Sequence, residues 1–246
     1  MTEAVVQRVD GGIAFTTTHW SVVLEAQSHS PAAQEALDKL CRAYWRPVHS
    51  FVRRQVNNPT DAEDLTQSFF ALILERRDLD AVRKEKGRLR SYLLTSLKHF
   101  LASEHRRAMA AKRGKGQRPV PLEDLNENEQ VEMRSTAHLS ADRLYERRWA
   151  LTLMEQVLRR LKDEYYNDGR GALFDSLKQL LPDEPGAQSR AEIAAQLGMT
   201  DNGLRQSFHR FRHRYQELLR EEIAHTVAIA SDIEDEVRYL ISVLRP

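Results

Sequence analysis

The sequence predicts an all-α protein made of two small helical domains, a linker between them and a C-terminal amphipathic helix. Apolar residues recur at spacings of three and four along most of the chain, which is the period of a helix. Alternating runs of β-branched residues, which would indicate strands, are absent. Gly114, Gly116, Pro119 and Pro121 interrupt the helical pattern near the middle of the chain. The expected order is therefore helical domain, linker, helical domain and tail.

The first domain is expected at residues 32–113, after an N-terminal extension at 1–31. Its helical patterns, together with a short one in the extension, fall at 16–26, 32–56, 61–76 and 88–111. Thr60 and Glu63 have the spacing of a capping box, so a helix is expected to begin at this point.

The linker is expected at 114–140, the second domain at 141–222 and the C-terminal tail at 223–246. Helical patterns here fall at 141–166, 173–181, 190–197, 200–225 and 231–244. Asn167, Asp168, Gly169 and Gly171 predict a break after the first of these helices.

Composition excludes several classes of protein. The chain has 246 residues, enough for one large or two small domains. Its mean hydropathy is −0.58, and no apolar run approaches the roughly 18 residues of a membrane span, so no membrane insertion is expected. No secretory signal is recognisable at the N-terminus. The single cysteine, Cys41, cannot form an internal disulfide or a thiolate zinc site, which favours a reducing, cytoplasmic location.

Charge is distributed unevenly although the net charge is only +1. Twelve Lys and Arg residues and two acids lie between Arg83 and Arg118. The stretch 122–132 is acidic, 205–220 is basic again, and the end of the chain is acidic. Two basic blocks separated by an acidic stretch favour two polyanion-binding surfaces joined by a linker, with solvated helix faces as the alternative.

The first chemical motif is the acidic helix start at 61–67. Leu65, Phe69, Leu72 and Ile73 share one face of the predicted helix and should be buried. A second face carries acids, an amide and small residues: Asp64, Gln67, Ser68 and Ala71. This patch could dock a positively charged partner, or its acids could simply complement the helix N-terminus.

The second motif is the basic helix at 88–111. Leu89, Leu93, Leu97, Phe100 and Leu101 form its predicted core stripe. The opposite face carries hydroxyls, cations and a small residue: Ser91, Thr95, Lys98, His99, Ala102 and Arg106. Such a face suits a phosphate backbone and exposed bases, and the basic loop at 80–87 before it could help to hold an unstacked base. A solvated helix is the alternative.

The third motif is a helix-turn-helix pattern at 190–204. A short helix ends at Gly198, Thr200 caps a second helix, Ala194 permits close crossing and Leu204 fills the core. The second helix is expected to turn five apolar residues inward: Leu204, Phe208, Phe211, Tyr215 and Leu218.

The opposite side of this helix carries base-reading and phosphate-binding residue types. Asn202, Gln206, His209 and His213 point outward, flanked by four arginines: Arg205, Arg210, Arg212 and Arg214. Asn and Gln suit adenine edges and Arg suits guanine, so major-groove reading is expected, with a plain helical hairpin as the alternative. The two histidines lack a third ligand nearby in the sequence, so no metal site is expected. No catalytic motif or cofactor-binding motif is present.

In their order and spacing, these motifs resemble a bacterial RNA polymerase sigma factor of the extracytoplasmic-function (ECF) type, in the sigma-70 family. Residues 61–67 resemble region 2.2, which in such proteins docks on the polymerase β′ clamp helices. Residues 88–113 resemble regions 2.3 and 2.4, which melt and read the −10 element. Residues 192–219 resemble region 4.2, which reads the −35 element. The resemblance spans roughly residues 20 to 222, with a gap at the linker.

The resemblance implies a non-enzymatic subunit that needs no cofactor and that binds core RNA polymerase, through the β′ clamp helices and the β flap, and promoter DNA. The implied polymerase-binding residues are Asp61, Asp64, Gln67 and Ser68. Those implied at the −10 element are Arg83, Lys84, Lys86, Arg88, Ser91, Thr95, Lys98, His99, Arg106 and Arg107. Those implied at the −35 element are Thr200, Asn202, Arg205, Gln206, His209, Arg210, Arg212 and His213.

Three features depart from the family pattern. The stretch 180–190 is longer than usual, the recognition helix opens with an unusual sequence at 200–204, and some 25 residues follow it. The opening at 18–21 and the acidic tail resemble a subset associated with serine/threonine kinases, which with an anti-sigma factor are the implied regulators. Two other functions stay open: a polymerase-independent helix-turn-helix regulator and a helical adaptor that binds acidic proteins.

The tail itself carries two signals. Ser231 and Glu234 have the spacing of a capping box. Ile233, Val237, Leu240, Ile241 and Leu244 form one apolar stripe, which must pack on something because so short a helix is marginal alone. The tail is expected either to complete the core of the second domain or to fold back over a basic DNA-binding surface.

Overall fold

The computed structural model describes residues 20–27, 31–56, 58–75, 88–112, 138–181 and 189–245, and within these it is helical throughout. The predicted all-α class is confirmed for this part of the chain. The helices are α1 (Trp20–Ala26), α2 (Pro31–Gln55), α3 (Pro59–Glu75), α4 (Leu89–Lys112), α6 (Ala141–Asn167), α7 (Gly171–Lys178), α8 (Arg190–Gln196), α9 (Asp201–Ala224), the short 3₁₀ helix η4 (Ala230–Asp232) and α10 (Ile233–Leu244).

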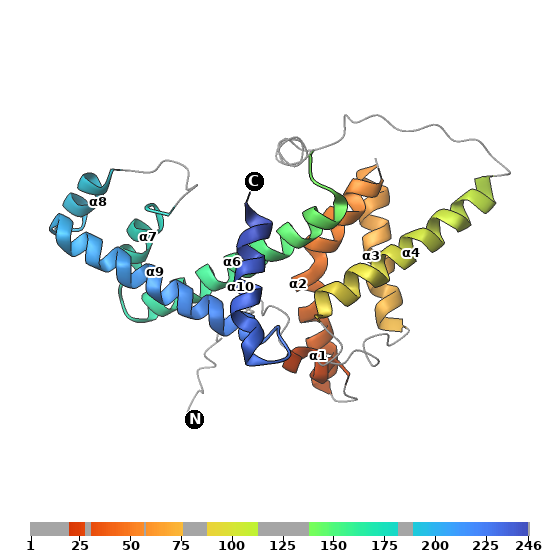
Figure 1. Cartoon of the computed structure of the whole chain (residues 1–246), viewed down its shortest axis with the longest axis horizontal. Coiled ribbons are helices and arrows are strands. Elements are labelled where there is room, and N and C mark those ends of the chain that lie inside the picture. Colours follow the sequence, from red (N-terminus) through yellow and green to blue (C-terminus); the bar gives the residue numbers. More distant parts are fainter. Residues whose placement is uncertain are drawn as a thin grey trace, which may run out of the picture.

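The molecule is elongated, and α6 runs through its middle, from beside α2 to the region of α7 and α9 (Figure 1). One end holds α1 to α4, the other holds α7, α8 and the first half of α9, and α10 stands between them. The first half of α6 packs against α2, while its second half packs against α7 and α9.

Two hydrophobic clusters follow from this arrangement. The larger one joins α1 to α4 with the first half of α6, through Tyr145, Trp149 and Leu153. The smaller one gathers the second half of α6, α7, α8 and most of α9 around Phe174 and Phe211, whose rings lie 5.7 Å apart between centroids. Helix α6 therefore contributes to both clusters. The division of the chain into two domains at the linker stays a prediction.

The C-terminal helix packs on α6 and α9, both in the predicted second domain, and its buried residues join the larger cluster rather than the smaller one. Its buried Leu240 and Val243 belong to the larger cluster, together with Ile223 at the end of α9. The reason is the position of α10, which packs on the first half of α6 and the last turns of α9. The tail thus ties the end of the chain to the first four helices.

Local signals explain where several helices begin. Thr200 caps α9 as predicted, because its hydroxyl accepts the N–H of Gly203 at 3.1 Å. Ser189 and Glu192 form a full capping box at the start of α8, which the sequence analysis missed.

The two predicted capping boxes are wrong. Helix α3 begins at Pro59, one residue before Thr60, and the Asn58 side-chain oxygen accepts the Thr60 N–H at 3.0 Å. Proline at the first helical position needs no N–H partner, so the cap moves back to Asn58. Ser231 lies inside η4, and α10 follows with Asp232 at its N-cap and no side-chain cap.

Glycines set two turns. Gly198, with a φ of +61°, turns the chain between α8 and α9 as predicted. Helix α7 begins at Gly171, two residues earlier than expected. A Cβ there would lie 3.0 Å from the Tyr166 ring, so glycine lets this ring pack against the helix start. Within the residues described, no helix has the length and apolar character needed to cross a bilayer.

Candidate polymerase and nucleic-acid interface

Helix α3 presents the predicted acid-amide patch to solvent. Asp61, Asp64, Gln67 and Ser68 are all exposed. The other side of the helix is anchored by Phe69 and Ile73, while Leu65 and Leu72 are partly buried. The anchored apolar face therefore fixes the direction in which the patch points.

Two features of α3 were not expected from its sequence. Thr66 is fully buried, and its hydroxyl donates to the Ala62 carbonyl oxygen at 2.7 Å, which satisfies the hydroxyl inside the core. Phe70 is also buried and stacks on Trp45 of α2, with 5.9 Å between ring centroids. Nothing in the spacing of the apolar residues within α3 marks this aromatic partner.

Helix α4 has the predicted division into two faces. Leu89, Leu93, Leu97 and Phe100 are buried, and Leu101 is partly buried. The predicted −10 residues from the second turn onward are exposed: Ser91, Thr95, Lys98, His99, Arg106 and Arg107. The loop residues Arg83, Lys84 and Lys86 lie outside the described residues.

Two cations on this face already have acidic partners. The Lys98 ammonium lies 2.6 Å from Asp142 in the first turn of α6, and Arg107 pairs with Glu104 at 2.6 Å. Both pairs are solvated, and exposed ion pairs of this kind contribute only about 0–1 kcal/mol. A phosphate could therefore replace either carboxylate at small cost.

The start of α4 is different, because its arginines are held by a buried acidic cluster. Arg90 is 3% exposed and pairs with Glu146 of α6 at 3.0 Å and with Glu236 of α10. Arg88 is 35% exposed, and its guanidinium lies 2.7 Å from the other oxygen of Glu236, a residue with no exposed surface. Glu236 thus bridges two arginines of the helix that was predicted to bind DNA.

Aromatic rings enclose this cluster. The Arg90 guanidinium lies 4.2 Å from the Trp149 ring centroid and 5.0 Å from that of Tyr239. The buried Tyr145 hydroxyl donates to the Arg90 carbonyl oxygen at 3.0 Å, and burial raises the pKa of this phenol well above its usual value. The cluster is therefore largely shielded from water.

The pKa values of the residues in the cluster are shifted by burial and by the neighbouring charges. Burial alone would lower the pKa of Arg90, but the charges of Glu236 and Glu146 reverse the effect and raise it. Burial raises the pKa of the Glu146 carboxyl, and Arg90 and Tyr239 only partly offset this. No spacing in the sequence marks Arg90, Glu146 and Glu236 as one cluster, because they lie on three helices far apart in the chain.

Helix α9 exposes its outward side chains. All eight residues implied at the −35 element are exposed: Thr200, Asn202, Arg205, Gln206, His209, Arg210, Arg212 and His213. The opposite side is buried at Leu204, Phe211 and Leu218 and partly buried at Phe208 and Tyr215. The short helix α8 packs beside it through Ile193 and Ala194, both buried, and Gly198 makes the turn between them.

Among the flanking arginines of α9, Arg214 contacts an acid on another helix. One terminal nitrogen and the ε nitrogen of Arg214 donate to the Glu164 carboxylate of α6, at 2.8 and 2.9 Å. This bidentate contact lowers the pKa of Glu164. Arg214 therefore fixes α9 on α6, while Arg205, Arg210 and Arg212 stay on the exposed side.

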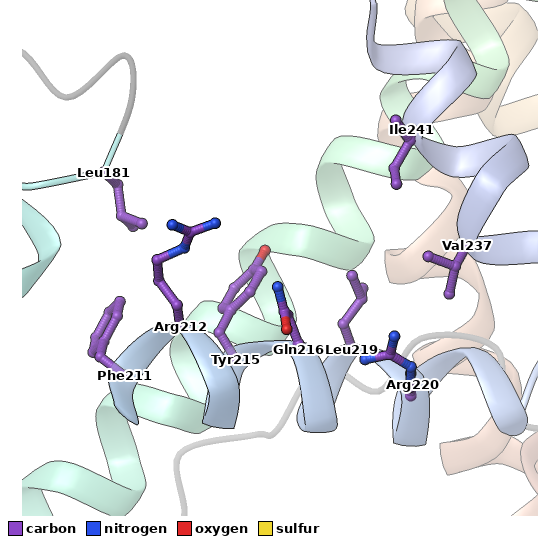
Figure 2. Close-up of a pocket in the computed structure, with 9 residues that line it drawn as sticks. All are labelled: Leu181, Phe211, Arg212, Tyr215, Gln216, Leu219, Arg220, Val237 and Ile241. Carbon is purple, nitrogen blue, oxygen red and sulfur yellow. The ribbon is translucent and has the colours of Figure 1, made fainter. Parts of the chain in front are cut away.

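A groove runs along α9 toward α10 (Figure 2). It has a volume of about 370 Å³, and its floor is formed mainly by Phe211, Tyr215 and Leu219. Val237 and Ile241 of α10 close one end, and Ile241 is 46% exposed. Helix α10 thus buries only part of its apolar stripe. Among the described residues, no group of three or more His, Cys, Asp or Glu side chains could hold a metal ion.

Comparison with known families identifies the segment that runs from within α2 nearly to the end of α4. Residues 40–111 match Sigma-70 region 2. This segment contains the acid-amide patch of α3 and nearly all of α4. Neither the curated proteins nor the solved structures contain a match to the chain. Residues 40–111 therefore form a sigma-70 region 2 domain, a domain of the non-enzymatic sigma factors.

Proposed function

We propose that the protein is a promoter-specificity subunit of the ECF type, acting in the cytoplasm. In this proposal α3 docks on the β′ clamp helices of core RNA polymerase, and α4 melts and captures the −10 element. Helix α9 reads the −35 element in the major groove, on a region 4-like unit that meets the β flap. An anti-sigma factor or a serine/threonine kinase is the proposed regulator.

One observation carries the proposal. Within the segment that matches region 2, two adjacent helices expose polar faces of different chemistry, acidic on α3 and basic with hydroxyls on α4. The acidic face suits a positively charged protein surface, and the basic face suits a phosphate backbone and unstacked bases. A protein that joins polymerase to opened promoter DNA needs both faces together.

The assignment to the −35 element is supported by the outward side of α9. Asn202 and Gln206 lie one turn apart with Arg205 between them, so amide and guanidinium groups project from the same exposed turn. These groups can read adenine and guanine edges, at about 1–3 kcal/mol per bidentate contact. The buried opposite side and the Arg214–Glu164 contact hold the helix rigidly on its support.

The docking role of α3 is tested with the double variant Asp64→Lys, Gln67→Ala. Both side chains are exposed, so the fold should be kept while affinity for core polymerase falls by about tenfold or more, or 1.4 kcal/mol. Titration of labelled protein with core polymerase measures this directly. Glu75→Lys is the matched control, because it reverses an exposed charge at the other end of α3, where a cation suits the helix terminus.

The result also separates the proposed function from its two rivals. Equal core affinity for the double variant and the wild type would reduce the acidic patch to a helix-start feature. Sequence-selective binding to duplex DNA without polymerase would then favour an independent helix-turn-helix regulator. Absence of any salt-dependent DNA affinity would favour an adaptor for acidic proteins, because phosphate contacts weaken steeply with salt.

A further inference from the structure

The C-terminal helix α10 is fastened to three different helices by polar contacts. In its first turn Glu234 pairs with Arg220 of α9 at 2.9 Å. Glu236 follows, bridging Arg88 and Arg90 at the start of α4. At its end the Leu244 carbonyl oxygen accepts a hydrogen bond from Arg147 of α6 at 2.8 Å. Of these contacts, only those of Glu236 use an acidic side chain that has no exposed surface.

Apolar packing also contributes to this attachment, since Ile233, Val237, Tyr239 and Leu244 pack against the larger cluster. Helix α10 has 12 residues, of which Leu240 and Val243 are buried apolar side chains. Ile241 stays 46% exposed at the end of the groove on α9 (Figure 2). An isolated helix of this length is marginal in water, so its order depends on docking. The carboxylate of Glu236 acts beside these apolar contacts as the buried charge that holds the helix in place.

Arg88 belongs to the same face of α4 as the exposed residues implied at the −10 element. Ser91 and Thr95 lie three and seven residues after it, spacings that return to one side of a helix. A nucleic-acid strand following this face toward the start of α4 would meet Arg88 next. At that position it would find the guanidinium already occupied by Glu236.

Building on the proposed function, we propose that Arg88 and Arg90 form a phosphate site for single-stranded promoter DNA that α10 occupies in the free protein. The Glu236 carboxylate stands in for the phosphate, since both are oxyanions that can accept hydrogen bonds from a guanidinium. Exchange of one anion for the other keeps the two arginines neutralised while it releases the tail. The site lies at the start of α4, and the tail leaves the outward side of α9 uncovered.

The exchange predicts a measurable competition. The apparent affinity of a site that is blocked most of the time falls by the fraction of molecules in which it is free. Glu236→Gln keeps the shape of the side chain and removes its charge, so it should free Arg88 and tighten binding by about threefold to tenfold. This gain in DNA affinity should vanish when Glu236→Gln is combined with Arg88→Ala, because the guanidinium that would bind the phosphate is then missing.

The experiment uses the full chain bound to core polymerase and a fluorescein-labelled, randomised single-stranded DNA, with anisotropy as the readout. Glu234→Gln is the matched control: it removes an equal charge from the same helix at an exposed pair, and its affinity should stay within about twofold of wild type. Hydrogen exchange of residues 233–244 in the wild-type complex, with and without the DNA, is measured in parallel. Because this exchange measurement uses only the wild-type protein, it does not depend on whether any variant folds.

Tighter binding by Glu236→Gln, lost with Arg88→Ala, and faster exchange in α10 on adding DNA are the expected results. Unchanged affinity together with unchanged exchange, in complexes that do bind the DNA, would overturn the shared site and leave the proposed function standing. Failure of every complex to bind DNA would overturn both. Release of α10 by inorganic phosphate alone, to the same extent as by DNA, would overturn the assignment of the site to a nucleic acid.

Discussion

The two basic helices α4 and α9 use arginine in different ways. On α9 the outward arginines Arg205, Arg210 and Arg212 are exposed, and only Arg214 is turned back onto α6. On α4 the first two arginines, Arg88 and Arg90, are held by acids from two other helices. Charge density along a sequence therefore does not tell which cations are available to DNA.

The difference has a physical cause. An arginine close to an apolar stripe can be buried only where an acid and an aromatic surface receive it. Arg90 adjoins the core residue Leu89, and it finds Glu236 at a sequence separation of 146 residues and the Trp149 ring 4.2 Å away. Arg205, Arg210 and Arg212 of α9 are exposed and need no such partners.

The largest expected effect comes from Arg90→Ala. This change leaves the carboxylates of Glu146 and Glu236 without their shared buried partner, so we expect a loss of about 3–5 kcal/mol in the free energy of unfolding. Arg106→Ala on the exposed face of the same helix should stay within about 0.5 kcal/mol. Urea denaturation measures both. A loss below about 1 kcal/mol for Arg90→Ala would show that the cluster contributes little to stability.

A second prediction concerns the recognition of DNA bases by α9. Gln206→Ala or Arg205→Ala should relax sequence preference at the −35 element by about 1–3 kcal/mol for each lost base contact, without destabilising the protein. Selection of bound sequences from a randomised duplex pool, with core polymerase present, measures the preference. An unaltered preference in both variants would remove these two residues from the reading face.

The third prediction concerns the exposed part of α4. Lys98→Ala and Arg106→Ala should each lower open-complex formation by up to about tenfold, or 1.4 kcal/mol, because each removes a cation from the face proposed to follow the DNA backbone. Permanganate footprinting of unpaired thymines reports the melting. Normal melting in both variants would contradict the assignment of this face to the −10 element.

The smallest expected effect lies at helix starts. Thr200→Ala removes the hydroxyl that caps α9 and should cost about 1 kcal/mol of stability. Thr60→Ala is the matched control, since Asn58 supplies the cap of α3, and should cost only a few tenths of a kcal/mol. Thermal unfolding compares the two. Equal losses would mean that the Thr200 hydroxyl does not act as a cap.

These cases show how far the sequence predicts the molecule. Helical period located the helices and their inner faces, and Thr200 and Gly198 marked the α8–α9 turn, because such signals are local. Spacing alone misplaced the caps of α3 and α10, since Pro59 and the η4 turn changed which residue comes first. The cluster around Arg90 could not be predicted, because it depends on how three distant helices pack.

Transcription reconstituted from core polymerase and the full chain on a library of promoter sequences tests the central claim most directly. A promoter-specificity subunit should start transcription from promoters that share an upstream and a downstream sequence block. Asp64→Lys, Gln67→Ala should abolish this activity, and Gln206→Ala should alter only the upstream block. Transcription no greater than that of core polymerase alone, with a folded wild-type chain, would contradict the assignment of the protein as a promoter-specificity subunit.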